Sequence, residues 1–126
     1  MSPLLIHGAE FYLRERDQGI LAQKSHEERK KSYSEELDKR SRDAFYWSAP
    51  GGESLANTCL RVDRVLTQLR EGCSGFRVVL VCHGNIMLAF RIRLERMKQS
   101  TFRTLLGNAE EKIHHCQVIM QLFHRI

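Results

Sequence analysis

The sequence predicts an α/β domain, and three features carry that prediction. A strand-like segment, 76–82, with apolar residues at Phe76 and 78–82, lies between two segments with helical spacing, 55–69 and 85–97. A second strand-like segment, 116–123, whose apolar residues include Val118, Ile119, Met120 and Leu122, comes last. A helix, a strand, a helix and a strand in this order indicate a right-handed crossover within a mostly parallel sheet.

The composition fits a single domain over residues 1–126. The chain is 42% hydrophobic, and its 20 basic and 15 acidic residues give a net charge of +5, which favours an anionic ligand. The basic residues are interleaved with acidic ones and the aromatic residues are clustered, so we expect no nucleic-acid partner. The sequence has no apolar run of membrane-spanning length, and its start lacks the basic flank of a signal peptide. We therefore expect a cytoplasmic location and no membrane partner.

The first half of the chain predicts short apolar pieces and one charged helix. The apolar pieces are residues 4–6 and 11–13. Residues 24–43 alternate in charge, which supports a solvated helix through pairs four residues apart: Glu27 and Lys31, Glu35 and Lys39, and Glu36 and Arg40. Only Tyr33 and Leu37 offer this helix a packing stripe. An aromatic group, 45–47, then precedes a helix-breaking segment, 48–52.

The second half predicts the core. An apolar stripe on one face of a helix is formed by Leu55, Cys59, Val62, Leu66 and Leu69. Glu53 and Ser54 suit the N-terminus of this helix, and Gly72 and Gly75 mark its end. The run 76–82 predicts a strand that is covered on both faces. The following helix, 85–97, has a second apolar face made by Ile86, Phe90, Leu94 and Met97, and residues 99–107 predict a short helix or turn.

The four cysteines predict reduced thiols and no metal site. Cys59, Cys82 and Cys116 lie inside apolar elements, and none of the four, Cys73 included, forms a C-x-x-C pair. His114, His115 and Cys116 are consecutive, but neighbouring side chains of a strand point to opposite faces. We therefore expect no metal and no other cofactor.

Three local motifs are candidates for chemistry. In L-R-E-R-D-Q-G, residues 13–19, a carboxylate between two arginines suits a general acid, or the segment is an exposed charged loop. P-G-G-E-S-L, residues 50–55, is a loop entering a helix, which is also what a plain turn and cap require. His83 and Gly84 follow the buried strand, where α/β sheets bind ligands and where helix N–H groups offer an anion site, although a structural histidine also fits.

Taken together and in this order, the three motifs resemble the histidine phosphatase superfamily, and specifically its phosphoglycerate mutase-like branch. The resemblance runs from about Leu13 to the last strand. It implies a three-layer α/β fold with a mostly parallel sheet. It also implies an activity on phosphomonoesters of small anionic metabolites, in which one histidine forms a phosphohistidine while arginines and a second histidine hold the phosphoryl oxygens.

The resemblance implies roles for matching positions of this chain. Glu15 matches the acid that protonates the leaving alkoxide, and His83 matches the second histidine; both are the expected catalytic residues. The expected substrate-binding residues are Arg14, Arg16, Gly84, Asn85, Glu53 and Ser54. The partner that these residues imply is a small phosphorylated metabolite or inorganic phosphate.

One family element is missing from the 126 residues. The nucleophilic histidine of the family lies in an R-H-G motif well before the acid motif, and this sequence contains no R-H-G. Ile6 stands in place of the arginine before His7, so we interpret His7-Gly8 as a coincidence. Ser48 stands where relatives often carry a basic residue. We therefore expect an N-terminally truncated domain that lacks the first strand and helix.

Two functional hypotheses stay open at this point. The first is a histidine phosphatase-like enzyme, and the second, which we favour for this polypeptide, is a catalytically incomplete remnant that binds phosphate or a protein partner. Loss of the family's central strand would leave a sheet edge unpaired, which invites homo-oligomers.

Overall fold

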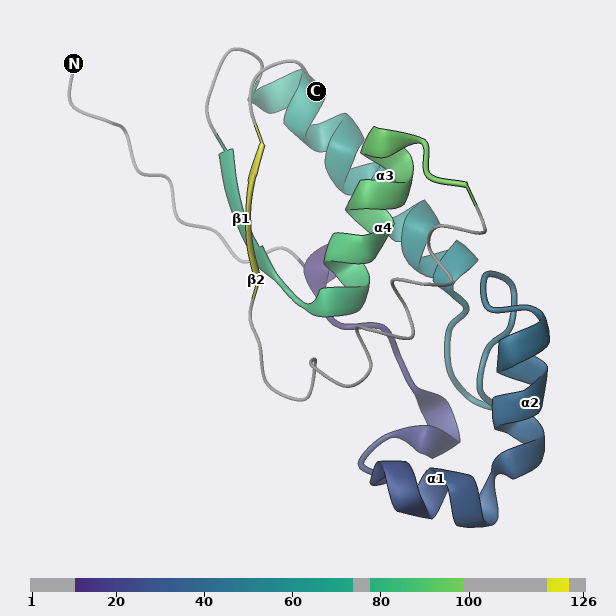
Figure 1. The fold of residues 1–126 in the computed structure, drawn as a ribbon. Helices are drawn as coiled ribbons and strands as arrows, with labels where there is room; N and C mark the ends of the chain where they lie inside the picture. Colours follow the sequence, from purple (N-terminus) through teal and green to yellow (C-terminus); the bar gives the residue numbers. More distant parts are fainter. Residues whose placement is uncertain (1–10, 74–77, 99–117, 123–126) are drawn as a thin grey trace.

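The computed structural model describes residues 11–73, 78–98 and 118–122 (Figure 1). These residues form, in chain order, η1 (Phe11–Leu13), η2 (Gly19–Leu21), α1 (His26–Ser32), α2 (Ser34–Arg42), α3 (Leu55–Gly72), β1 (Val78–Cys82), α4 (Gly84–Glu95) and β2 (Val118–Leu122). Predictions for residues 4–6, His7, 99–107 and His114 to Cys116 lie outside the described residues.

Helix α3 (Leu55–Gly72) is the longest element, and the sequence predicted it well. The Ser54 hydroxyl accepts a hydrogen bond from the Asn57 N–H (3.0 Å), which satisfies one of the free donors at the start of the helix. The helix ends at Gly72, as the glycines indicated. The predicted stripe is buried at every position except Leu69, which is partly buried against the same core.

Strands β1 and β2 pair in an antiparallel direction, which corrects the prediction of a parallel crossover. Val78 lies opposite Leu122, and Cys82 lies opposite Val118. The element order alone did not fix this direction, because a connection of more than twenty residues between α4 and β2 lets the last strand run either way. The mostly parallel three-layer sheet stays a prediction for the rest of the fold.

One face of β1 is covered, where the sequence predicted two. Leu80 and Cys82 are buried, whereas Val79 and Val81 on the opposite face expose 55% and 52% of their surface. This alternation is the period of two that a half-covered strand requires. The prediction that β1 is covered on both faces was therefore wrong, because a run of β-branched and apolar residues also occurs in a strand that is covered on one face.

Helix α4 (Gly84–Glu95) follows β1 after a single residue. Ile86 and Phe90 are fully buried, as predicted, but Leu94 is 37% exposed. The helix ends at Glu95 because Arg96 adopts a left-handed conformation (φ 50°), so Met97 lies beyond the helix, but it packs partly buried against the same core. Burial of Leu88, Ala89 and Ile92 shows that the apolar surface of α4 is wider than the predicted face.

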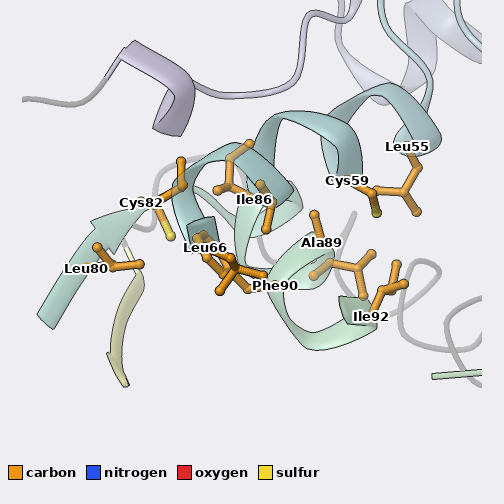
Figure 2. Close-up of a cluster of buried hydrophobic side chains, with 12 residues drawn as sticks. Leu55, Cys59, Leu66, Leu80, Cys82, Ile86, Ala89, Phe90 and Ile92 are labelled. Carbon is orange, nitrogen blue, oxygen red and sulfur yellow. The ribbon is translucent and has the colours of Figure 1, made fainter. Parts of the chain in front are cut away.

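The core lies where α3, β1 and α4 meet (Figure 2). Figure 2 shows Leu55, Cys59 and Leu66 of α3 facing Ile86, Ala89 and Phe90 of α4, with Leu80 and Cys82 closing one end. An ion pair between Arg93 and Asp63 (2.9 Å) joins the same two helices at the surface. The stiff unit that results presents the end of β1 to the loops of the first half.

Helices α1 and α2 replace the one charged helix that the sequence predicted for residues 24–43. They are separated at Tyr33, between two serines, and all three residues have a lower helix propensity than the Lys, Arg and Glu around them. We call the pair, residues 26–42, the helical arm. It lies to one side of α3 and α4 in Figure 1, and none of its residues is buried.

Candidate functional site

The corner between β1 and α4 places an imidazole at the start of a helix. His83 is the N-cap residue of α4, in an extended conformation (φ −100°, ψ 166°), and its exposed side chain makes no capping hydrogen bond. Gly84 is buried and Asn85 is half-buried. The first N–H groups of α4 point toward the end of β1, where they carry the positive end of the helix dipole. Imidazole and amide donors therefore lie together, which suits an anion.

Glu15 belongs to the same end of β1. Its half-buried carboxylate accepts a hydrogen bond from the Arg16 backbone N–H (2.7 Å). The pKa of the Cys82 thiol is raised, first by burial and then by the negative charge of Glu15. The Glu15 carboxylate is therefore near enough to Cys82 for its charge to act on the thiol, and Cys82 is the residue before His83. A shared site of Glu15 and His83 stays a prediction.

The two arginines beside Glu15 differ in what they contact. Arg16 is 7% exposed, and its Nε and Nη2 donate to the backbone carbonyls of Glu53 (2.9 Å) and Trp47 (3.2 Å). Arg14 is exposed, with its guanidinium 4.1 Å from the centre of the Phe11 ring. Arg14 therefore reaches the surface, whereas Arg16 joins two loops. Substrate binding by either arginine stays a prediction.

Glu53 is engaged by a buried arginine. Its Oε1 accepts from Arg61 Nη2 (2.7 Å) and from the Asp17 N–H (2.9 Å), and its Oε2 accepts from Arg61 Nε (2.9 Å). Burial alone would raise the pKa of Glu53, but these hydrogen bonds and the positive charge of Arg61 hold it below its ordinary value of 4.5. Ser54 is 5% exposed and caps α3. A substrate-binding role for Glu53 or Ser54 also stays a prediction.

Two glycines let the backbone of the L-R-E-R-D-Q-G motif (residues 13–19) pack directly against the backbone of the P-G-G-E-S-L motif (residues 50–55). Gly19 has φ +54°, and a Cβ atom there would lie 2.2 Å from the Pro50 carbonyl oxygen. A Cβ atom on Gly52 would lie 2.6 Å from the Asp17 carbonyl oxygen. Backbone hydrogen bonds join the same segments, from Ile20 to Pro50 (3.0 Å) and from Glu53 to Asp17 (2.9 Å). We call this contact between residues 17–20 and 49–53 the loop junction.

Arg61 and Val62 form the helical R-V pair that follows G-G-E-S-L in the pattern that the sequence resembles, but the sequence assigned Arg61 no role. Arg61 is buried on α3 and donates from Nη1 to the carbonyls of Tyr12 (2.8 Å) and Arg14 (3.0 Å), in addition to its pair with Glu53. The available signal was its place on the helix, three residues after Thr58 and one before Val62, on the inward side of the stripe. An arginine on a buried face needs partners, and these are what the structure supplies.

Metal ligation and membrane insertion find no support in the part of the chain that the structure describes. Within residues 11–73, 78–98 and 118–122, no three His, Cys, Asp or Glu side chains are grouped so that they could hold a metal ion. In the same ranges, no helix combines the length and apolar character needed to cross a bilayer.

Comparison with known proteins identifies the family. Residues 9–117 match the model of the histidine phosphatase superfamily (branch 1), so the chain belongs to this superfamily. The match confirms the resemblance seen in the three motifs. A search of curated proteins found no match to this chain.

Proposed function

We propose that the end of β1 is a phosphoryl site, at which this protein binds phosphomonoesters of small anionic metabolites or inorganic phosphate. The observation that supports it best is the exposed His83 at the N-terminus of α4, next to Cys82, on whose thiol the charge of Glu15 acts. Membership of the histidine phosphatase superfamily supports the same substrate class.

The proposed roles follow from the chemistry of each group. The imidazole of His83 and the amides of Gly84 and Asn85 would donate to phosphoryl oxygens, where charge gathers during phosphoryl transfer. Glu15 would supply a proton to the ester oxygen, because an alkoxide leaves poorly without one. Arg14, exposed beside Glu15, would contact the rest of an anionic substrate. Arg16, Glu53 and Ser54 would contribute indirectly, through the loops that they join.

We further propose that these 126 residues bind without turning over. The phosphohistidine mechanism needs a nucleophilic histidine in an R-H-G segment, and the sequence contains none. A non-catalytic phosphate-binding or interaction module is therefore the form of the function that we favour for this polypeptide. We also propose a homo-oligomer through the unpaired sheet edge, and the exposed apolar side chains of Val79 and Val81 on β1 add support for such an association. The cytoplasmic location and the absence of a cofactor stay predictions from the sequence.

The test compares inorganic phosphate binding and p-nitrophenyl phosphate hydrolysis in the wild type, His83→Ala and Glu15→Gln. We expect His83→Ala to weaken phosphate binding about tenfold or more, the worth of one charge-assisted hydrogen bond. His26→Ala is the matched control, since His26 is an exposed histidine at the start of α1. Equal phosphate affinity in His83→Ala would refute the site. Hydrolysis above background that both variants abolish would refute the non-catalytic form.

A further inference from the structure

We propose that Arg61, together with Glu53, is a positioning residue for the Glu15 carboxyl group. Neither side chain binds the phosphoryl group in this proposal; both hold the segment that carries Glu15 in place. The inference rests on the proposed function, in which Glu15 is the acid. Four observations carry it.

The first observation concerns the chain before Glu15. The Nη1 atom of Arg61 donates to the carbonyl oxygens of Tyr12 (2.8 Å) and Arg14 (3.0 Å). Residues 14–18 lie between η1 and η2 and have no helix or strand of their own. One guanidinium nitrogen therefore sets the path of the main chain up to the residue immediately before Glu15.

The second observation concerns the chain after Glu15. The Oε1 atom of Glu53, which Arg61 holds, accepts a hydrogen bond from the Asp17 N–H (2.9 Å). The Glu53 N–H in turn donates to the Asp17 carbonyl (2.9 Å). Glu15 is thus flanked on both sides by main-chain groups that reach the same buried ion pair.

The third observation is how firmly that ion pair is held. The Arg61 and Glu53 side chains are 10% and 15% exposed, and two of the Arg61 nitrogens meet the two carboxylate oxygens. Arg61 projects from the second turn of α3, whose apolar stripe packs on α4. The pair therefore ties the Glu15 segment to the core of α3, β1 and α4, the unit that also carries His83.

The fourth observation is that Glu15 itself is oriented locally. Its Oε1 accepts the N–H of Arg16 (2.7 Å), and the Arg16 side chain is anchored to the Glu53 carbonyl (2.9 Å). This carboxylate orientation depends on the peptide that Arg61 and Glu53 hold in place. A lysine at position 61 would keep the charge, but a single ammonium group does not reproduce the planar fork that spans two carbonyls and a carboxylate.

The direct test follows the Arg16 amide by NMR while the pH is changed from about 3 to 7, the range in which a glutamate carboxyl titrates. In the wild type, the Arg16 amide proton shifts as its acceptor loses a proton, and Glu15→Gln abolishes that shift. We expect Arg61→Lys to abolish it as well. Glu53→Gln, which keeps the size of the side chain, is expected to reduce it, and serves where Arg61→Lys does not fold.

The matched control is Arg91→Lys. Arg91 also forms a two-nitrogen ion pair, with Glu95 at 3.1 and 3.2 Å, but on the surface of α4. This variant should keep the Arg16 titration of the wild type. A folded Arg61→Lys or Glu53→Gln protein with the wild-type titration would overturn the proposal.

The second test asks whether Arg61 acts on phosphate-ester binding through Glu15. In a double-mutant cycle on the binding of p-nitrophenyl phosphate, whose ester oxygen Glu15 would contact, Arg61→Lys should weaken affinity roughly threefold to tenfold in the wild type and leave it nearly unchanged when Glu15 is already Gln. Equal losses in both backgrounds would mean general structural damage and would overturn the positioning role. Wild-type protein that fails to bind phosphate, while its Arg16 titration still depends on Arg61, would reject the proposed function and leave the positioning intact.

Discussion

The helical arm and the core of this protein are both helical, but different forces hold them. In the core, α3 and α4 bury twelve apolar and thiol side chains together with β1, and the helices pack directly on one another. In the arm, α1 and α2 bury no residue, and hydrogen bonds join the arm to the rest of the chain, from Trp47 to Glu36 (3.2 Å) and from Arg29 to the Leu21 carbonyl (2.8 Å).

The difference shows what each region contributes. Apolar burial of this kind supplies most of the free energy of folding and makes the core stiff. Caps and exposed ion pairs are worth little each, so the arm keeps its shape locally without stabilising the whole. The candidate site is built on the first region, and the loop junction separates it from the second. Four predictions test this contrast.

The largest effect should come from the centre of the core. Phe90 is fully buried between α3 and α4, so Phe90→Ala removes a large apolar contact and leaves a cavity. We expect the free energy of unfolding to fall by about 3–5 kcal/mol, measured by chemical denaturation. Leu37→Ala in the arm is the control, with a loss below about 1 kcal/mol. Similar losses in the two variants would mean that the arm is as firmly packed as the core.

The next effect should come from the loop junction. Gly19→Ala combines a strained φ of +54° with a Cβ atom 2.2 Å from a carbonyl oxygen, and we expect a loss of roughly 2 kcal/mol or more. Gly51→Ala is the matched control, because its φ is +75° but its Cβ would meet only the Gly19 Cα at 4.0 Å. It should cost about 1 kcal/mol, the strain alone. Equal losses on denaturation would show that the close approach contributes nothing.

Acid should weaken the region around the core more than the arm. The pKa of Glu53 lies below its ordinary value of 4.5, so its pairing with Arg61 stabilises the fold fully above about pH 4.5, and this contribution is lost as the pH falls through the lowered value. Glu53→Gln should therefore flatten the dependence of unfolding free energy on pH below about 5.

The matched acid in the arm is Glu36. Its pKa is also lowered, by hydrogen bonds from Lys39 and Trp47, but its partner Lys39 is 59% exposed, whereas Arg61 is 10% exposed, so salt screens the pair in the arm more strongly. Glu36→Gln should leave the acid limb of the stability curve almost unchanged. If Glu36→Gln reduces the dependence of unfolding free energy on pH as much as Glu53→Gln does, then ion pairs of the core and of the arm contribute equally, and this part of the contrast is wrong.

The smallest effect should come from the cap of α1. Ser25 and Glu28 form a capping box with hydrogen bonds of 3.1 and 2.8 Å, and Ser25→Ala removes half of it. We expect faster hydrogen exchange confined to α1 and a change of global stability below about 0.5 kcal/mol. Ser54→Ala, at the buried cap of α3, should instead lower global stability by about 1–2 kcal/mol. A global loss from Ser25→Ala as large as from Ser54→Ala would contradict this.

The sequence predicted correctly those elements whose apolar spacing matches the face that they bury in the fold. The stripe of α3 is regular because one side of the helix faces α4 along its whole length, and Ser54 capped it as expected. The corner at His83 was placed within one residue. The break at Tyr33 was missed, because acid–base spacing continues through it while the two flanking serines weaken the helix. The direction of β2 depends on a connection whose path leaves no local pattern.

The sequence predicted only those residues of the candidate site that belong to a recognisable motif. Glu15 and His83 were named through the resemblance; the charge of Glu15 acts on Cys82, the residue before His83, and the roles of both residues stay predictions. Arg61 was assigned no role, because its role depends on carbonyl groups of Tyr12 and Arg14, and every residue type carries such groups. Interactions with the main chain are invisible to a search for side-chain motifs.

The loop junction has a consequence for how this chain can vary. Residues 22–43 begin on one side of that contact and return to it on the other, where the backbones of Ile20 and Pro50 are already joined at 3.0 Å. A segment whose two ends are held together by the loop junction can be lengthened, shortened or exchanged without moving the core. Evolution and protein engineers alike can therefore rebuild that stretch while Glu15 keeps its distance from the end of the sheet.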